Sequence, residues 1–181
     1  MTGAPLVGRR GARAPGGRAR ARAACGRHSG VALVVGTPAD LLGHVGEDLG
    51  TSSWHRVSQP EVDAFARATH DEQWIHVDAE RAAAGPFGTT IVHGYMTLAL
   101  VVPLTAELLR VERSSLVLNY GVDRVRFPAP VPVGSRLRLS GTLASAAEVA
   151  GGVQVVLSLL GERDGGERPV LAADVVFRHL A

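Results

Sequence analysis

The sequence predicts an α+β domain in which an antiparallel β-sheet wraps around one long, buried α-helix. Two observations support this fold class. Residues 58–109 carry helix signals and end in a long segment that is apolar nearly all round. Residues 114–180 instead contain stretches that alternate between apolar and polar side chains, separated by glycine-rich turn signals. A helix that is apolar on every side must be covered, and the concave face of a sheet would cover it.

Length and composition favour one globular domain. The chain has 181 residues, of which 46% are hydrophobic and 20% are charged, as in ordinary soluble proteins. Cys25 is the single cysteine, so an intramolecular disulfide and a cysteine-based metal cluster are both excluded. This cysteine usage fits a reducing cytoplasm.

The basic character of the chain belongs to its first 30 residues. Residues 1–30 hold seven arginines and no acid, so the net charge of +2 combines +7 here with −5 in the rest. The segment has no apolar period, and we expect a disordered extension over 1–30 before a domain over 31–181. An organellar transit peptide has a similar composition. The segment lacks aromatic residues that stack on bases, and we expect no nucleic-acid partner.

The domain is predicted to open with short elements. Residues 37–42 favour a short helix with proline in its first turn, and residues 52–57 favour a strand. Ser58 and Glu61 then have the spacing of a capping box. The apolar residues that follow fall on one face of a helix that reaches about Thr69.

A short loop and a second helix start follow. We expect residues 71–76 to form a loop, after which Asp78 caps a short helix over 79–84. Glycine and proline at residues 85–88 end that helix. Thr90 then caps the long buried helix, which we expect to run over 91–109.

A transmembrane span is the alternative interpretation of this long helix, because its length is nearly sufficient. Five residues with polar side chains or helix-breaking character interrupt it, and we therefore expect no membrane span. These are His93, Thr97, Pro103, Thr105 and Glu107.

Four antiparallel strands are predicted after the helix. Glycine pairs at residues 151–152 and 165–166 mark hairpin turns between them. The expected strands are Ser114–Phe127, Arg136–Ala144, Gly152–Glu162 and Pro169–Leu180.

Asp71 and His76 are the candidate acid and base. A carboxylate and an imidazole five positions apart could converge on one water molecule and exchange protons with it near neutral pH. Gln73, between them, could orient one of the two. The spacing alone is a weak signal, because it also arises by chance. No third ligand stands at metal-site spacing unless His70 points the same way, so we predict no metal.

Gly94 is the candidate oxyanion site. The first N–H groups of a helix have no internal partner and carry partial positive charge. Without a side chain, Gly94 would let a substrate oxygen approach its N–H. Relief of crowding between helix and sheet explains the glycine equally well. We expect the neighbouring His93 to pack or cap rather than to take part in catalysis.

Several motifs together resemble the MaoC-like dehydratase family of hot-dog-fold, (R)-specific enoyl-CoA hydratases. The Gln-Trp pair at residues 73–74 is most similar to the NodN-like branch. The resemblance covers the chain from about residue 46 onward. The matching segments are Asp71–Asp78, Gly85–Gly88, Ile91–Met96, Asn119–Gly121 and Arg126–Val131.

The resemblance implies a function for each candidate. Asp71 and His76 would activate water for addition to C3 of a trans-2-enoyl thioester, and the Gly94 N–H would stabilise the thioester oxygen. The product would be an (R)-3-hydroxyacyl thioester, formed reversibly without a metal or redox cofactor. The substrate would be an acyl-CoA or acyl-carrier-protein thioester. The family forms homodimers whose sheets join edge to edge, which agrees with the need to cover an exposed sheet edge.

The sequence departs from the family pattern near Asp71, and it leaves two alternative functions open. His70 stands where the family often has glycine, and its side chain could crowd Asp71. Arg124 and Arg126 could meet a CoA phosphate or remain solvated surface residues. A hot-dog thioesterase would use one carboxylate and would not require His76. A non-catalytic acyl-thioester-binding subunit of a heteromeric dehydratase would need neither catalytic group.

Overall fold

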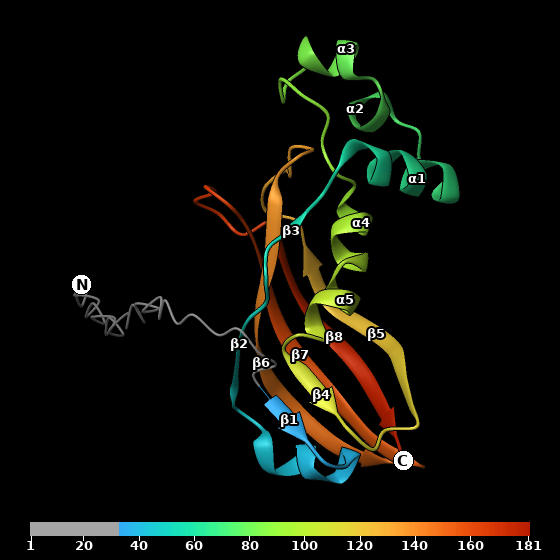
Figure 1. The fold of residues 1–181 in the computed structure, drawn as a ribbon, viewed down its shortest axis with the longest axis vertical. Coiled ribbons are helices and arrows are strands. Elements are labelled where there is room, and N and C mark those ends of the chain that lie inside the picture. Colours follow the sequence, from blue (N-terminus) through green and yellow to red (C-terminus); the bar gives the residue numbers. More distant parts are fainter. Residues whose placement is uncertain (1–32) are drawn as a thin grey trace, which may run out of the picture.

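The computed structural model describes residues 33–181, and the extension predicted over 1–30 lies outside the described residues. One antiparallel sheet has the order β2-β6-β7-β8-β5, with β3 also paired to β6. The long strands β5 to β8 lie side by side and curve together (Figure 1). The strands of this sheet are β2 (Asp48–Thr51), β3 (His55–Arg56), β5 (Leu116–Arg126), β6 (Arg136–Val149), β7 (Gly152–Arg163) and β8 (Leu171–Leu180).

The four predicted C-terminal strands are confirmed. Along β7, buried residues alternate with half-buried ones from Val153 to Leu159, which is the period of two expected for a sheet with one covered face. The β6–β7 hairpin turns at Gly151, whose positive φ of 80° favours glycine. The strand expected over 52–57 is reduced to the two residues of β3.

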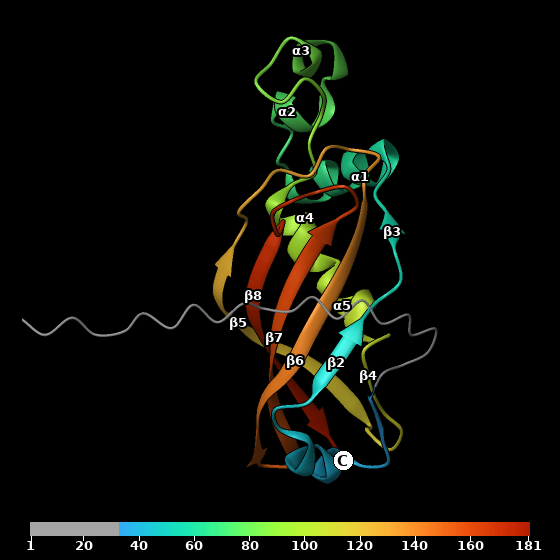
Figure 2. The same ribbon diagram turned by 90° about the vertical axis from the view of Figure 1, so that its left-hand side faces the viewer.

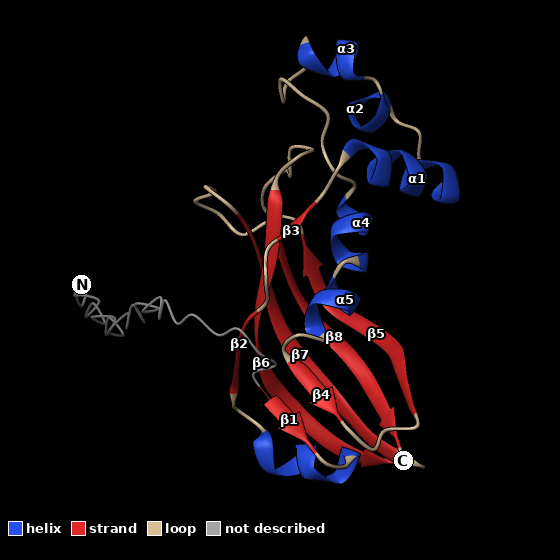
Figure 3. Cartoon of the chain, viewed as in Figure 1, coloured by secondary structure: helices blue, strands red, loops and turns tan. Residues whose placement is uncertain are grey.

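The helices lie on one face and at both ends of the sheet (Figure 3). α4 and α5 run along the concave face, and α1 to α3 gather beyond one end, as the side view in Figure 2 also shows. The helices are η1 (Pro38–His44), α1 (Gln59–Thr69), α2 (Trp74–Val77), α3 (Ala79–Ala83), α4 (Gly94–Ala99) and α5 (Val101–Thr105).

The prediction of one long helix over 91–109 is wrong in its bounds. The helix begins at Gly94, breaks at Leu100 and ends at Thr105. Pro103 has no N–H, so the carbonyl four residues earlier loses its helical donor, which explains the break between α4 and α5. Leu109 instead opens strand β4 (Leu109–Val111), which pairs in parallel with β1 (Leu33–Val35).

The helix start is delayed because the preceding residues are extended. Ile91 forms an isolated bridge with Pro132, and the Val92 N–H donates to the Val131 carbonyl at 2.8 Å. Backbone groups committed to this pairing cannot also begin a helix. The expectation that Thr90 caps the helix is therefore wrong, and His93 occupies the N-cap position.

One side of α4 and α5 packs against the sheet. Val101 and Leu104 of α5, and Leu108 just after it, belong to the same buried cluster as the inward-facing residues of β6, β7 and β8. The opposite side is open, since Tyr95 is 73% exposed and Val102 is 44% exposed. The expectation of burial on all sides is thus wrong for the single chain.

Within residues 33–181, no helix has both the length and the apolar character needed to cross a membrane.

Candidate active site

The end of α1 places Asp71. The predicted capping box is confirmed, because the Ser58 N–H and hydroxyl both donate to Glu61 Oε2 at 2.6 Å. The helix ends at Thr69, and the C-cap residue His70 is left-handed, with a φ of 59° and a ψ of 24°. This conformation favours glycine, and it turns the chain out of the helix immediately before Asp71.

His76 lies in the short helix α2, so the prediction of a loop over 71–76 is wrong for its last three residues. The side chain is buried, with 7% exposure, and its Nδ1 lies 2.6 Å from the Ile91 carbonyl oxygen. A carbonyl can only accept, so Nδ1 carries the hydrogen. In the neutral ring, Nε2 is then free to accept a proton.

The fold brings Asp71, His76 and His93 together. One carboxylate oxygen of Asp71 and one ring nitrogen from each histidine all lie within 4.8 Å of one another. Asp71 is exposed, whereas both histidines are buried. The two imidazole rings stack with their centroids 3.7 Å apart and their planes 22° apart. The expected packing role of His93 is confirmed.

The surroundings of His76 favour its neutral form. Burial, the largest influence, lowers the pKa of His76 below its ordinary value of 6.5. The hydrogen bond to Ile91 and the charge of Asp71 oppose this shift, and the electrostatic influence of the nearby His93 ring adds to it. The net result is a buried imidazole that is neutral at pH 7.

An open, mainly apolar cavity of about 330 Å³ lies beside His76. Gly94 lines the same cavity, and its N–H lacks a helical partner because it is the first residue of α4. A Cβ built on Gly94 would lie 3.0 Å from the Phe127 ring, so the glycine also permits close packing. The other lining residues are Phe87, Ile91, Val92, Thr97, Phe127, Ala129, Pro130, Val131 and Val170.

Gln59 holds the backbone around His76, a role that the sequence did not suggest. Its amide nitrogen donates to the His76 carbonyl at 2.8 Å and to Asp63 Oδ1 at 2.7 Å. Its amide oxygen accepts from the Thr90 hydroxyl at 2.7 Å. Thr90 therefore anchors the segment before Ile91 instead of capping a helix. No local pattern signals contacts that span 17 and 31 residues.

The remaining candidates are not members of this cluster. Gln73 is exposed at the N-cap of α2 and is not among the residues that line the cavity. Arg124 is engaged by Asp174 on the adjacent strand. Arg126 is exposed and donates to the neighbouring Val125 carbonyl at 2.7 Å.

Among residues 33–181, the one group of three potential metal ligands is Asp71, His76 and His93, so the third group is His93 and not His70. The lone pairs of an imidazole lie in its ring plane, and two nearly parallel stacked rings do not direct them to one point. His93 Nε2 also already contacts the Asp71 carbonyl oxygen at 2.9 Å. This donor arrangement does not fit the tetrahedral geometry of protein zinc sites.

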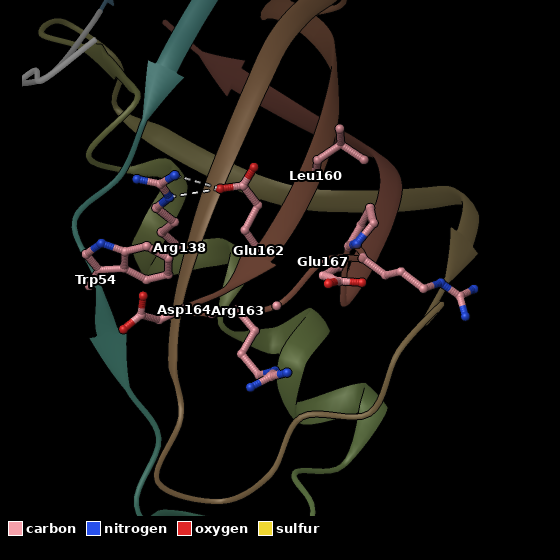
Figure 4. Close-up of a pocket in the computed structure, with 11 residues that line it drawn as sticks. Trp54, Arg138, Leu160, Glu162, Arg163, Asp164 and Glu167 are labelled. Carbon is pink, nitrogen blue, oxygen red and sulfur yellow. Dashed lines mark hydrogen bonds and ion pairs between the residues drawn. The ribbon is translucent and has the colours of Figure 1, made fainter. Parts of the chain in front are cut away.

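A second hollow of about 330 Å³ lies at the β7–β8 turn (Figure 4). The Arg138 guanidinium lies 4.4 Å from the centroid of the Trp54 ring, and its Nε donates to Glu162 Oε2 at 2.9 Å. Arg136 pairs with Asp164 nearby. These paired charges lie apart from Asp71 and His76, so the hollow is not part of the candidate site.

Comparison with known families agrees with this geometry. The family model described as "MaoC like domain" matches residues 40–160. The chain belongs to the MaoC-like domain family. The match includes Asp71, His76, His93 and Gly94.

Individual relatives support the same assignment. The chain is 49% identical to 3-hydroxyacyl-thioester dehydratase Z of Mycobacterium tuberculosis over 144 residues, which cover 79% of this chain and 95% of the relative. It is 48% identical to nodulation protein N of Rhizobium leguminosarum bv. viciae over 102 residues, 55% of this chain and 63% of the relative. The resemblance to the NodN-like branch is thereby confirmed.

The fold is shared with solved hot-dog proteins. The unliganded R-hydratase of Pseudomonas aeruginosa superposes with a TM-score of 0.64 at 21% identity, covering 80% of this chain and 85% of that one. The predicted hot-dog fold, with its sheet around a central helix, is confirmed, although the helix is shorter than expected.

Proposed function

We propose that this protein is an (R)-specific enoyl-CoA hydratase, or 3-hydroxyacyl-thioester dehydratase, that adds water reversibly to a trans-2-enoyl thioester. The main support is that Asp71 and His76 lie close together beside an apolar cavity that Gly94 also lines. Two relatives are named as a dehydratase and a hydratase of this kind, which supports the reaction class and its stereochemistry.

His76 is the proposed general base. Its Nδ1 is bonded to the Ile91 carbonyl, so Nε2 takes a proton from water. Asp71 accepts a hydrogen bond from the water's second hydrogen, which stays on the oxygen, and stabilises the imidazolium that forms. The water oxygen bonds to C3 of the substrate as the C2–C3 π bond breaks, and the imidazolium then gives its proton to C2.

Gly94 supplies the proposed oxyanion contact. Negative charge develops on the thioester oxygen while C2 awaits its proton, and a fixed N–H at the start of α4 would stabilise it. The water's two hydrogens end on C2 and on the new hydroxyl, so the reaction is balanced without a redox cofactor or metal. CoA enters only as part of the substrate.

The lowered pKa of His76 gives the proposed reaction a pH dependence. The base is active when neutral, so kcat/KM should hold as pH falls toward 6.5. It should decline only below that value, where His76 becomes protonated.

We also propose that two copies join along β5. This strand is the sheet edge, and nearly all of its residues are exposed, including Leu116, Val117 and Tyr120. An unpaired apolar edge is normally covered. Light scattering should give twice the chain mass of 18.9 kDa. The single cysteine supports a cytoplasmic location as part of this proposal.

Hydration of crotonyl-CoA and of a medium-chain trans-2-enoyl-CoA tests the function, followed by loss of the enoyl-thioester absorbance. Asp71→Asn and His76→Gln should each lower kcat by about 10²–10⁴-fold. Asp48→Asn and His44→Gln are matched controls at the opposite end of the sheet, in β2 and η1, and should retain wild-type rates.

Other outcomes would contradict the proposal or restrict its substrate. Release of free CoA without hydration would assign a thioesterase instead. Hydration that survives both Asp71→Asn and His76→Gln would remove these groups from the chemistry. Inactivity on CoA thioesters together with activity on carrier-protein thioesters would change the substrate but keep the reaction.

A further inference from the structure

His93 is the most enclosed polar side chain of the candidate site, with 2% exposure. One face of its ring stacks on His76 at a centroid distance of 3.7 Å. The Phe65 ring of α1 lies 5.1 Å away at a tilt of 52°. The imidazole is therefore fixed between helix α1 and the catalytic histidine.

Within residues 33–181, the His93 ring makes one polar contact, and that contact is to Asp71. His93 Nε2 lies 2.9 Å from the Asp71 carbonyl oxygen. Because a carbonyl only accepts, Nε2 must carry the hydrogen and donate it. The bond joins the start of α4 to the loop after α1, which lies 22 residues earlier in the chain. It restrains the backbone of the residue that supplies the carboxylate.

Packing alone does not explain a histidine at this position. His93 Nδ1 is buried without a hydrogen-bond partner in the described part of the chain, and an unpaired buried polar atom lowers stability. A phenylalanine would fill similar space without that cost. The benefit of the histidine therefore lies in the Nε2–H bond to Asp71.

We propose that His93 is a positioning residue that holds Asp71, His76 and Gly94 in one rigid arrangement. It bonds the Asp71 backbone, stacks on the His76 ring and directly precedes Gly94 in the chain. This inference rests on the proposed function, since the three restrained residues are its acid, base and oxyanion donor. Small displacements of such groups are costly in rate.

The test compares His93→Phe with His93→Gln in the enoyl-CoA hydration assay. Phenylalanine keeps an aromatic ring but removes the donor, and kcat should fall by about 10–100-fold with KM changed less than about threefold. Glutamine places an amide nitrogen near the position of Nε2, and it should recover most of the lost kcat.

A double-mutant cycle with Asp71→Asn separates positioning from a general structural role. If His93 acts through Asp71, His93→Phe should cost less than about threefold once Asp71 is already asparagine. His179→Phe is the matched control, because His179 is also buried with an unpaired Nδ1 but lies on β8 away from the cavity. It should leave kcat unchanged.

Several results would overturn the inference. These are a wild-type kcat in His93→Phe, full additivity with Asp71→Asn, a loss in His93→Gln as large as in His93→Phe, or an equal loss in His179→Phe.

Hydrogen–deuterium exchange of the amides at 70–73 distinguishes this inference from the proposed function. Exchange should be faster in His93→Phe than in wild type or His179→Phe. If exchange is faster in His93→Phe but the wild-type protein does not hydrate enoyl-CoA, the positioning role of His93 stands and the proposed hydratase function is rejected. Unchanged exchange in His93→Phe would reject the restraint even in an active hydratase.

Discussion

Gln59 provides a sharp test of how the scaffold supports His76. Replacing it with leucine keeps much of its volume but removes three hydrogen bonds. These reach the His76 carbonyl at 2.8 Å, and Asp63 Oδ1 and the Thr90 hydroxyl at 2.7 Å each. The His76 carbonyl and the Thr90 hydroxyl would lose these partners, and the segments around His76 and Thr90 would lose their link through Gln59.

The magnitude follows from these contacts. A hydrogen bond contributes about 0.5–1.5 kcal/mol net, and Gln59 is only half-buried, so Gln59→Leu should cost roughly 2–3 kcal/mol of unfolding free energy. For a domain of this size, that corresponds to a fall in Tm of about 5–10 °C. Movement of the His76 backbone should also lower kcat by about tenfold.

Thermal unfolding and the hydration assay measure both effects. Gln154→Leu is the matched control, since Gln154 accepts one hydrogen bond from Arg178 at 3.0 Å on β7, away from the cavity. It should cost no more than about 1 kcal/mol and leave kcat unchanged. A Gln59→Leu protein with wild-type Tm and kcat would refute the assignment of Gln59 as an anchor for His76.

Three further predictions concern other residues. Burial lowers the pKa of His179, so its neutral form contributes stability above pH 6.5 that is lost as pH falls through the lowered pKa. In denaturant melts, the unfolding free energy of His179→Phe should therefore rise relative to that of wild type as pH drops below 6.5. Parallel pH dependences of the two proteins would contradict this. His70→Gly removes a left-handed non-glycine residue and should raise stability by up to about 1 kcal/mol without slowing hydration; a lower Tm would show that the His70 side chain makes a stabilising contact. Gly94→Ala and Gly94→Pro both place a new Cβ 3.0 Å from the Phe127 ring, but only proline removes the N–H. The kcat of Gly94→Pro should therefore be about 10²–10³-fold lower than that of Gly94→Ala. Equal rates in the two variants would exclude the N–H as the oxyanion donor.

Local patterns predicted much of the fold. The capping box at Ser58 and Glu61 and the Asp78 cap of α3 form as expected, because each depends on residues no more than three positions apart. The four long C-terminal strands were also predicted, since alternation and turn residues are local signals. The bounds of α4 and α5 were missed, because the extended pairing of Ile91 and Val92 with residues 131–132 lies outside any local window.

The sequence by itself determined the fold class, the positions of Asp71 and His76, and the glycine at position 94. These follow from periodicity, spacing and motif resemblance, which are properties of neighbouring residues. Only the tertiary structure decided that His93 bonds to Asp71, that Gln59 anchors His76, and that Gln73 stays outside the cavity. The physical reason is that groups 17 to 31 residues apart in the sequence meet only after α1 packs beyond one end of the sheet and α4 along its concave face. Burial of His76 beside the Ile91 carbonyl then lowers the pKa of its imidazole and favours the neutral form.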